Sequence, residues 1–333
     1  AVDCRINARA AVVKAFADAR VLRQVDGIIR QCSAFLADAD TPESHLLHTV
    51  FQNKLQASSL FSEAERNLCL QTHEKLLTSC VFPAYRSLSD ALSSLRGKGT
   101  QNAGGLSRQE GGLSYYAYLL RSRVGVDASP EELTRLLTQQ LADQCAEMQI
   151  ILDQNPSLSL SEQALVLPFS TPEEMLADLQ NAVSEDFPVL SGIAYEVKTV
   201  DDSLKDFLSP AFYLTPPMDT GTPNVIYINP AASYQGLELF TTLAHEGFPG
   251  HLYQTVTFQR QKSSNIRNLL CTSGFAEGWA TYIEPYAYQY AADYIQDPSA
   301  TELARISWLN RSINLCMYSL LDIEIHYNGW TQA

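Results

Sequence analysis

The most informative stretch of this chain is LAHEGFPGHLYQ, residues 243–254, in which Glu246 directly follows the first of two histidines. The zinc signature HExxH places two histidines four residues apart on one helix face and uses the glutamate as a general base. Here His251 follows His245 after six residues, so the regular signature is not matched. On an unbroken helix, positions six apart differ by roughly 240°, and the two rings would point to different sides.

The dipeptide Pro249-Gly250 separates the two histidines and predicts a break in the helix. Proline removes an amide donor and clashes with the preceding turn, whereas glycine tolerates unusual dihedral angles. We expect the helix to bulge or to restart here, with Pro249 as a first-turn residue of the second segment. Such a break allows both imidazole rings to converge on one metal ion. The alternative is that His251 caps a helix or bonds a carbonyl.

A second cluster, GFAEGWATYIE at residues 274–284, offers a third ligand. Zinc hydrolases with two histidines often complete the site with a carboxylate from a following helix. Glu277, 26 residues after His251, is the candidate. Glu284 lies two helical turns further on the same face and is either an acceptor behind a ligand or a solvated charge. The two segments together predict a Zn²⁺ site made of His245, His251 and Glu277.

Helix signals dominate the rest of the chain. The segments at 129–132 (SPEE) and 171–174 (TPEE) each supply an N-cap, a proline at the first helical position and a glutamate three residues after the cap. Ser62 with Glu65 predicts another helix start. Strand signals are few: an alternating run at 195–199 and a β-rich run at 224–229, bounded by prolines. We expect a mainly α protein with a small β element next to the active-site helix.

The expected organisation is one helical unit over residues 1–333. It comprises a helical layer at 1–185, a β-containing insertion at 186–230 and metal-site helices at 231–333. The first residues, AVDCRINARAAVVKAF, show no initiator methionine and no signal or cleavage-site pattern, and are typical of the middle of a helix. The last residues, IHYNGWTQA, stop just after a turn signal. We therefore expect the sequence to be a fragment of a longer protein.

Composition excludes several classes of protein. The 333 residues carry 37 acidic and 23 basic side chains, a formal charge of −14, and 46 % of them are hydrophobic. That much apolar mass supports a core and excludes an intrinsically disordered chain. The charge argues against a nucleic-acid-binding protein, because phosphate contacts need clustered Lys and Arg. No run approaches the roughly 18 apolar residues that a membrane helix needs. The sequence carries no signal for oligomeric state.

The segments HEGFPGHLYQ and AEGWATYIE together resemble a bacterial domain-of-unknown-function family, number 885, which has an HExxPGHxxQ core. The segments GGLSYYAYLLRSRVGVDASPEEL, AFYLTPPMDTGTPNVIYINP and IHYNGWTQA are similar to family segments in the same order, so the resemblance covers most of the chain from about Gly111 onward. The family is itself distantly similar to HExxH-plus-Glu zinc metallopeptidases (gluzincins), with two residues inserted between the Glu and the Gly-His. Members are generally longer, and many are exported proteins or lipoproteins. The resemblance therefore implies a helical metallopeptidase-like architecture and an exported or membrane-anchored bacterial lipoprotein.

The same resemblance implies a zinc metallopeptidase acting on a peptide substrate. His245, His251 and Glu277 would be the zinc ligands and Glu246 the base. Zinc with three protein ligands keeps a position open for water and lowers the pKa of that water toward ~7. Glu246 would take a proton from the water and pass it to the leaving amine.

The oxyanion of such a reaction needs a donor besides the metal. His326 and Tyr327 are the candidates, with Tyr253 and Arg311 behind them, and a structural role for His326 is the alternative. The VIYIN run at 225–229 is either an edge strand that pairs with an extended peptide or an ordinary buried strand. Two other functions stay open: a catalytically inactive helical cell-surface or binding scaffold that retains the metallohydrolase fold, and zinc hydrolysis of a non-peptide amide.

Overall fold

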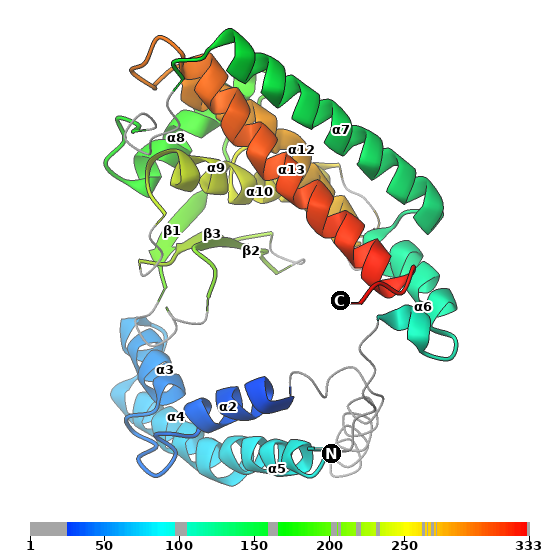
Figure 1. Ribbon diagram of the computed structural model, residues 1–333. Helices are drawn as coiled ribbons and strands as arrows, with labels where there is room; N and C mark the ends of the chain where they lie inside the picture. Colours follow the sequence, from blue (N-terminus) through cyan, green and yellow to red (C-terminus); the bar gives the residue numbers. More distant parts are fainter. Residues whose placement is uncertain are drawn as a thin grey trace. The chain divides into compact units, whose positions relative to one another are not determined.

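The computed structural model describes residues 25–96, 105–158, 166–200, 205, 208–217, 221–230, 234–261, 264, 266–267, 270 and 272–331 (Figure 1). The chain separates into two compact units, residues 1–103 and residues 104–333. The described residues are mainly helical and include one small three-stranded sheet, which confirms the predicted fold class.

The first unit is helical over its described residues. Its elements are α2 (Val25–Phe35), α3 (Leu46–Ala57), α4 (Glu63–Leu76), the π-helical turn η2 (Leu77–Val81) and α5 (Phe82–Ser93). A capping box begins α4, as predicted: the Ser62 hydroxyl accepts from the Glu65 amide, and the Glu65 carboxylate accepts from the Ser62 amide. Val25 and Ile29 of α2 pack with Leu92 of α5 in a small core of this unit.

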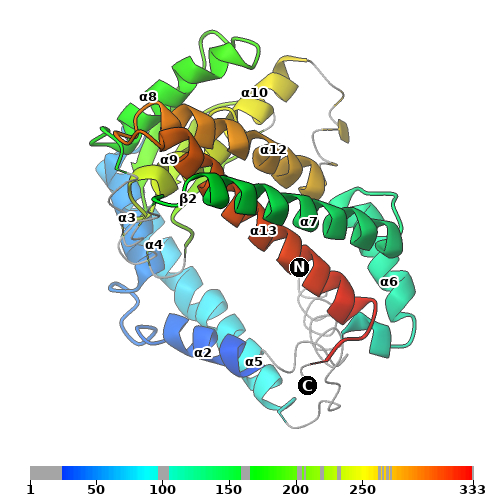
Figure 2. The ribbon, with the colours of Figure 1, turned by 45° about the horizontal axis from the view of Figure 1, so that its top comes forward.

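The second unit contains the long helices. Its helical elements are η3 (Leu106–Arg108), α6 (Gly112–Leu119), η4 (Leu120–Val124), α7 (Pro130–Gln154), α8 (Pro172–Ala182), η6 (Val183–Glu185), α9 (Gly236–Glu246), α10 (His251–Arg260), α12 (Ser273–Ala292) and α13 (Ala300–His326). The helix α13 packs against both α7 and α12 (Figures 1 and 2). Ser129 and Thr171 cap α7 and α8 by accepting from the amides of Glu132 and Glu174, so both capping signals are confirmed.

The sheet consists of β1 (Tyr195–Thr199), β2 (Ala211–Leu214) and β3 (Asn224–Ile228) in the order β1-β3-β2. β3 pairs in parallel with β1 and antiparallel with β2. The VIYIN run therefore supplies the central strand. Of its two interpretations, the edge strand is wrong because neighbours pair with both of its sides, and the ordinary buried strand is the one observed. The edge strand β2 contacts α9, so the small β element lies next to the helix that carries His245, as predicted.

A buried apolar cluster holds the helices of the second unit together. Phe240 and Leu243 of α9, Leu252 of α10 and Ile283 of α12 are all fully buried in this cluster. Burial of each such side chain contributes about 1.5–3 kcal/mol to the free energy of unfolding. The three helices that carry the candidate ligands are thus anchored in one core. Among the described helices, none combines the length and the apolar character that a membrane span requires.

Candidate metal centre

The predicted helix break separates the two histidines. The first helix, α9, ends at Glu246, and α10 begins at His251. Between them the backbone folds back, since the Gly250 amide donates to the Ala244 carbonyl at 3.0 Å. A Cβ atom at Gly250 would overlap carbonyl oxygens at the end of α9, so this close approach requires glycine. The second helix starts two residues after Pro249, which therefore precedes the first turn of α10 rather than lying within it.

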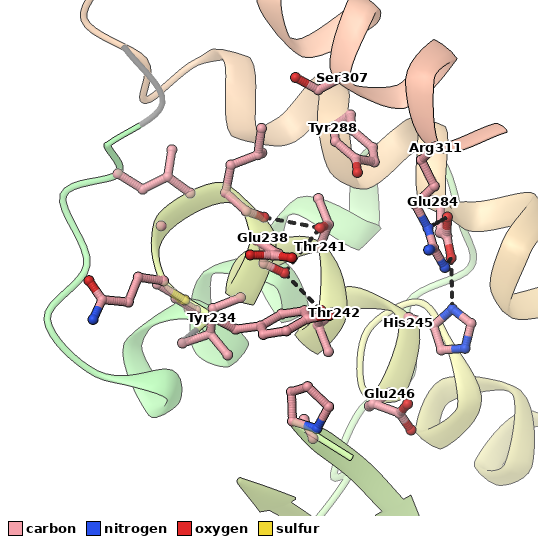
Figure 3. A pocket seen from close by; sticks show the side chains of 18 of the residues that line it. Tyr234, Glu238, Thr241, Thr242, His245, Glu246, Glu284, Tyr288, Ser307 and Arg311 are labelled. Carbon is pink, nitrogen blue, oxygen red and sulfur yellow. Dashed lines mark hydrogen bonds and ion pairs between the residues drawn. The ribbon is translucent and has the colours of Figure 1, made fainter. Parts of the chain in front are cut away.

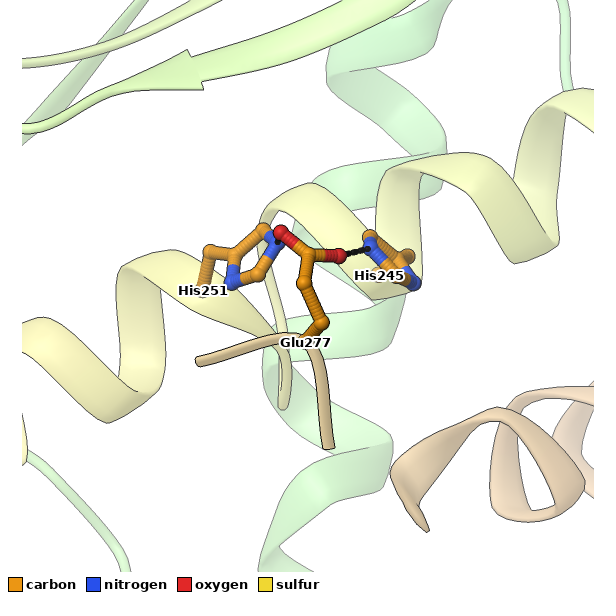
Figure 4. A group of neighbouring side chains, drawn as sticks. All are labelled: His245, His251 and Glu277. Carbon is orange, nitrogen blue, oxygen red and sulfur yellow. Dashed lines mark ion pairs between the residues drawn. The ribbon is translucent and has the colours of Figure 1, made fainter. Parts of the chain in front are cut away.

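The break brings both imidazole rings to the carboxylate of Glu277 on α12 (Figure 4). The distance from His245 Nε2 to Glu277 Oε2 is 3.5 Å, and the distance from His251 Nε2 to Glu277 Oε1 is 3.6 Å. The two rings are 4.8 Å apart between centroids and nearly perpendicular, with an interplanar angle of 89°. One atom from each of the three side chains thus lies within 4.8 Å of the other two, so the group can hold a metal ion.

The spacing of these atoms fits a small divalent cation. Zinc binds histidine nitrogen and carboxylate oxygen at 2.0–2.2 Å, which sets neighbouring ligand atoms in a tetrahedron about 3.3–3.6 Å apart. The separations of 3.5 Å from His245 to Glu277 Oε2 and 3.6 Å from His251 to Glu277 Oε1 are of this size, but they end on different carboxylate oxygens. With one atom from each side chain the set spans up to 4.8 Å, so the three side chains would draw slightly closer around a bound ion. Two imidazoles and a carboxylate are also the donor set of known catalytic zinc sites, in which a fourth position stays open.

A buried ion pair orients the His245 ring. Glu284 of α12 is only 2 % exposed, and its Oε1 lies 2.9 Å from His245 Nδ1. Arg311 of α13 donates to both oxygens of the same carboxylate, from Nε at 2.6 Å and from Nη2 at 2.8 Å. With the proton on Nδ1 directed at Glu284, the Nε2 lone pair of His245 faces Glu277 and is available to a metal. Of the two interpretations of Glu284, the structure supports the acceptor behind a ligand.

The local charges shift the pKa values of the two histidines in opposite directions. Burial lowers the pKa of His245, but the hydrogen bond to Glu284 and the carboxylates of Glu246 and Glu277 raise it by more, so the net shift is upward. Burial and the neighbouring His245 ring lower the pKa of His251, with a smaller opposing effect of Glu277. The hydrogen bonds from His245 and Arg311 hold the pKa of Glu284 below its usual value even though burial raises it.

Glu246 is fixed by the sheet. Its Oε2 accepts a hydrogen bond of 2.8 Å from the backbone amide of Tyr213 in β2. Burial raises the pKa of Glu246, and the Tyr213 amide and His245 oppose this shift without cancelling it. A carboxyl group whose pKa is raised toward neutrality is suited to accepting and returning a proton.

A cavity of about 1310 Å³ opens beside this carboxylate (Figure 3). Its lining includes His245 and Glu246 at one end, the start of α9 near Tyr234, and one face of α13 around Arg311. The volume exceeds the roughly 300–1,000 Å³ of typical small-ligand pockets, so an extended ligand can be accommodated.

The structure does not bring His326 and Tyr327 to the metal group. His326 ends α13, where its Nδ1 accepts from the Leu106 amide at 3.3 Å, and the Tyr327 hydroxyl donates to Glu131 at 2.9 Å. Along α13, His326 lies 15 residues beyond Arg311, a separation of about 22 Å. Their contacts are with η3 and α7, and their catalytic role stays a prediction.

Two groups at the site carried little or no signal in the sequence. Tyr213 acts through its backbone amide, which every residue except proline possesses, so no residue type could indicate it. The sequence predicts Arg311 only as a donor for the oxyanion, behind His326 and Tyr327. It is one of two arginines in α13, and only the fold places it against Glu284. The spacing of Glu277 and Glu284 indicated a shared helix face but not which of the two is buried.

The sequence profile of a family described as "Bacterial protein of unknown function (DUF885)" matches residues 3–333. The crystal structure of the "putative lipoprotein" from Colwellia psychrerythraea is similar to this chain with a TM-score of 0.73 and 22 % sequence identity. The similarity covers 92 % of this chain and 55 % of that protein, so the chain spans about half the length of that protein. The comparison with curated protein sequences gave no match.

Proposed function

We propose that this chain, which belongs to the bacterial family of unknown function DUF885, is the part of a zinc-dependent hydrolase that holds the metal site, and that this hydrolase cleaves peptide bonds. The observation that carries the proposal is the convergence of His245, His251 and Glu277, with Glu246 held beside them by the sheet. Each of the three ligands comes from a helix that is anchored in the apolar core.

The residues of the site have different roles in the proposed hydrolysis. His245, His251 and Glu277 would hold the metal, and Glu284 keeps the His245 ring in the required tautomer. When bound, zinc polarises the scissile carbonyl and lowers the pKa of its water ligand. Glu246 has one oxygen engaged by the Tyr213 amide, and its other oxygen takes the proton of the attacking water and delivers it to the leaving nitrogen.

The outer edge of β2 supports a peptide as the substrate. In an antiparallel pair, residues alternate between bonding the partner strand and facing away from it. The Asn229 amide donates to the Pro210 carbonyl, and the register pairs Ala211 with Ile228, so residues 211 and 213 direct their backbone groups away from β3. The Tyr213 amide donates to Glu246 from this edge, so an edge that pairs with no further described strand lies next to the proposed base. An extended peptide adds to such an edge by main-chain hydrogen bonds.

The proposal is tested by metal binding and by hydrolysis. Dialysed protein is titrated with zinc, and the loaded protein is incubated with a peptide library read by mass spectrometry. We expect one zinc per chain, and we expect Glu246→Gln to keep the zinc while hydrolysis falls by about 10²–10⁴-fold. Glu132→Gln, which changes an exposed carboxylate in the first turn of α7, is the matched control and should be silent.

Three outcomes would contradict the proposal. Absence of zinc binding at one equivalent would reject the metal centre. Zinc binding without any hydrolysis would favour a non-catalytic scaffold. Hydrolysis that Glu246→Gln leaves unchanged would reject Glu246 as the base.

The location of the protein is part of the same proposal. The structural relative from Colwellia psychrerythraea carries the word lipoprotein in its description, which supports an exported, membrane-anchored location for the full-length protein. Fractionation of the native host tests this proposal, because a lipoprotein is recovered with membranes and is released by detergent. Recovery in the cytosol would contradict it.

A further inference from the structure

We propose that the cavity beside Glu246 binds a positively charged nitrogen of the substrate, either its α-ammonium group or a basic side chain, at the carboxylate of Glu238. This inference rests on the proposed hydrolase function and specifies its substrate class. It is carried by the shape, the charges and the hydrogen-bond acceptors of the cavity.

One face of α9 leads from the metal group into the cavity. Glu238, Thr242, His245 and Glu246 all line it, at helical positions i, i+4, i+7 and i+8 (Figure 3). The seven residues from Glu238 to His245 correspond to about 10.5 Å along the helix axis. That length is about three residues of extended chain, so a peptide cleaved at the metal group would reach Glu238 with a nearby terminus or with a long side chain.

The charge of the cavity is negative. Arg311 is the only lysine or arginine among the described residues that line it, and two of its nitrogens are bound to Glu284. The charges of this pair cancel, and the Glu246 carboxylate belongs to the metal group. The uncompensated negative charge of the cavity is that of Glu238, which is exposed and whose carboxylate makes no hydrogen bond or ion pair with a described residue. A cationic group of the substrate would give this carboxylate a partner.

The hydroxyl groups of the lining also favour a ligand that donates hydrogen bonds. The Thr242 hydroxyl donates to the Glu238 carbonyl at 2.7 Å, and the Thr241 hydroxyl donates to the Leu237 carbonyl at 3.0 Å. On the opposite wall the Ser307 hydroxyl donates to a carbonyl of its own helix at 2.8 Å. With their hydrogens engaged, the Thr242 and Ser307 hydroxyls act as acceptors toward a ligand, whereas the buried Thr241 hydroxyl also bonds Tyr288. These acceptors and the Glu238 carboxylate suit an ammonium or guanidinium group.

The test uses the 333-residue chain with zinc and the Glu246→Gln change, so that peptides bind without being cleaved. Four carboxyl-labelled pentapeptides combine a free or an acetylated amino terminus with lysine or norleucine at one position. Binding is read by fluorescence anisotropy. We expect loss of the decisive positive charge to weaken binding about tenfold, and the acetylation and norleucine arms identify which nitrogen is bound.

Variants assign the effect to one carboxylate. Glu238→Gln should weaken binding of the charged peptide about tenfold, leave the acetylated norleucine peptide unchanged and reduce the salt dependence. Glu132→Gln, outside the cavity, should change nothing. Equal affinities for all four peptides, or equal effects of the two variants, would overturn the inference.

The outcome is separable from that of the proposed function. Hydrolysis of peptides without a preference for the charged ones would reject the role of Glu238 and leave the hydrolase intact. Binding that depends on Glu238, in a protein that hydrolyses no peptide even with Glu246 present, would reject the hydrolase function and leave the role of Glu238 intact.

Discussion

Removal of Arg311 is expected to destabilise the second unit strongly, because it leaves the Glu284 carboxylate buried without its cation. Glu284 is 2 % exposed, and Arg311 supplies two charge-assisted hydrogen bonds to it. Loss of one partner of a buried ion pair costs 3–5 kcal/mol. Because the Arg311 side chain is itself 45 % exposed, water can replace part of the lost interaction. We therefore expect Arg311→Met to lower the free energy of unfolding by about 3 kcal/mol, the lower end of that range.

The same helix provides a matched control. Arg305 of α13 also makes two hydrogen bonds to a carboxylate, from Nε at 2.6 Å and from Nη2 at 2.9 Å, but its partner Glu147 is 41 % exposed. An exposed ion pair contributes about 0–1 kcal/mol. The variants Arg305→Met and Arg311→Met thus differ in the burial of the carboxylate left behind, while residue type, helix and bonding pattern are the same.

Urea denaturation at pH 7 measures the change in the free energy of unfolding, and thermal denaturation measures the change in Tm. For a unit of this size, 3 kcal/mol corresponds to a decrease in Tm of about 6–12 °C. Glu284→Gln added to Arg311→Met removes the stranded charge, so the double variant should be more stable than Arg311→Met alone. If Arg305→Met and Arg311→Met cost the same, or if the two changes at Glu284 and Arg311 are additive, the reasoning is refuted.

The pH dependence provides an independent check. In the wild type the pKa of Glu284 lies below 4.5, because hydrogen bonds from His245 and Arg311 outweigh burial. A depressed folded-state pKa contributes stability that is present above the unfolded pKa and is lost as the pH falls through the folded pKa. Without Arg311, burial raises this pKa, and the penalty is relieved as the carboxylate becomes protonated. The difference between wild type and Arg311→Met should therefore shrink as the pH falls from 7 toward 4.5. A difference that does not change with pH would contradict this account.

Three further predictions concern the metal group itself. Gly250→Ala should destabilise the protein by more than about 1 kcal/mol, because the added Cβ would meet backbone carbonyls. Gly278→Ala should stabilise the protein by about 0.5–1 kcal/mol, because the added Cβ would meet open space at a helical position; thermal unfolding measures both changes. Zinc binding at pH 6.5 should release protons, since the pKa of His245 is raised above 6.5 and its Nε2 proton must leave; calorimetry in two buffers measures the release, and no release would contradict the prediction. Glu284→Gln should weaken zinc binding by about 10–100-fold, and an unchanged affinity would contradict the role of the buried carboxylate.

Much of the local structure follows from the sequence. The SPEE and TPEE segments predict the starts of α7 and α8, and the Ser129 and Thr171 hydroxyls make the expected caps. Such signals are local: a cap needs only a side chain and an amide three residues away, so chain neighbours determine it. The two site segments are also recognisable, because glycine and proline punctuation around His245 and His251 is equally local.

The parts that the sequence could not supply are contacts between distant segments. The VIYIN run predicted a strand, yet its central position depends on pairing with Ala211–Leu214, which lies in a Pro-rich stretch with a weak strand signal. Likewise, helical periodicity placed Glu284 on the face of Glu277, but its burial depends on α13 packing against α12. Periodicity gives the direction of a side chain, whereas burial depends on what the fold places opposite it.

The break between α9 and α10 changes how the site is held together. In an uninterrupted helix, one set of backbone hydrogen bonds fixes both histidines. Here each histidine belongs to a separate helix, and the angle between the helices is held by bonds to α12: the Trp279 indole donates to the Pro249 carbonyl at 2.8 Å, and Glu284 anchors His245. Glu277 also lies on α12, so the third ligand belongs to the same helix as Trp279 and Glu284, which position the other two ligands. The geometry of the centre therefore depends on the packing of α12.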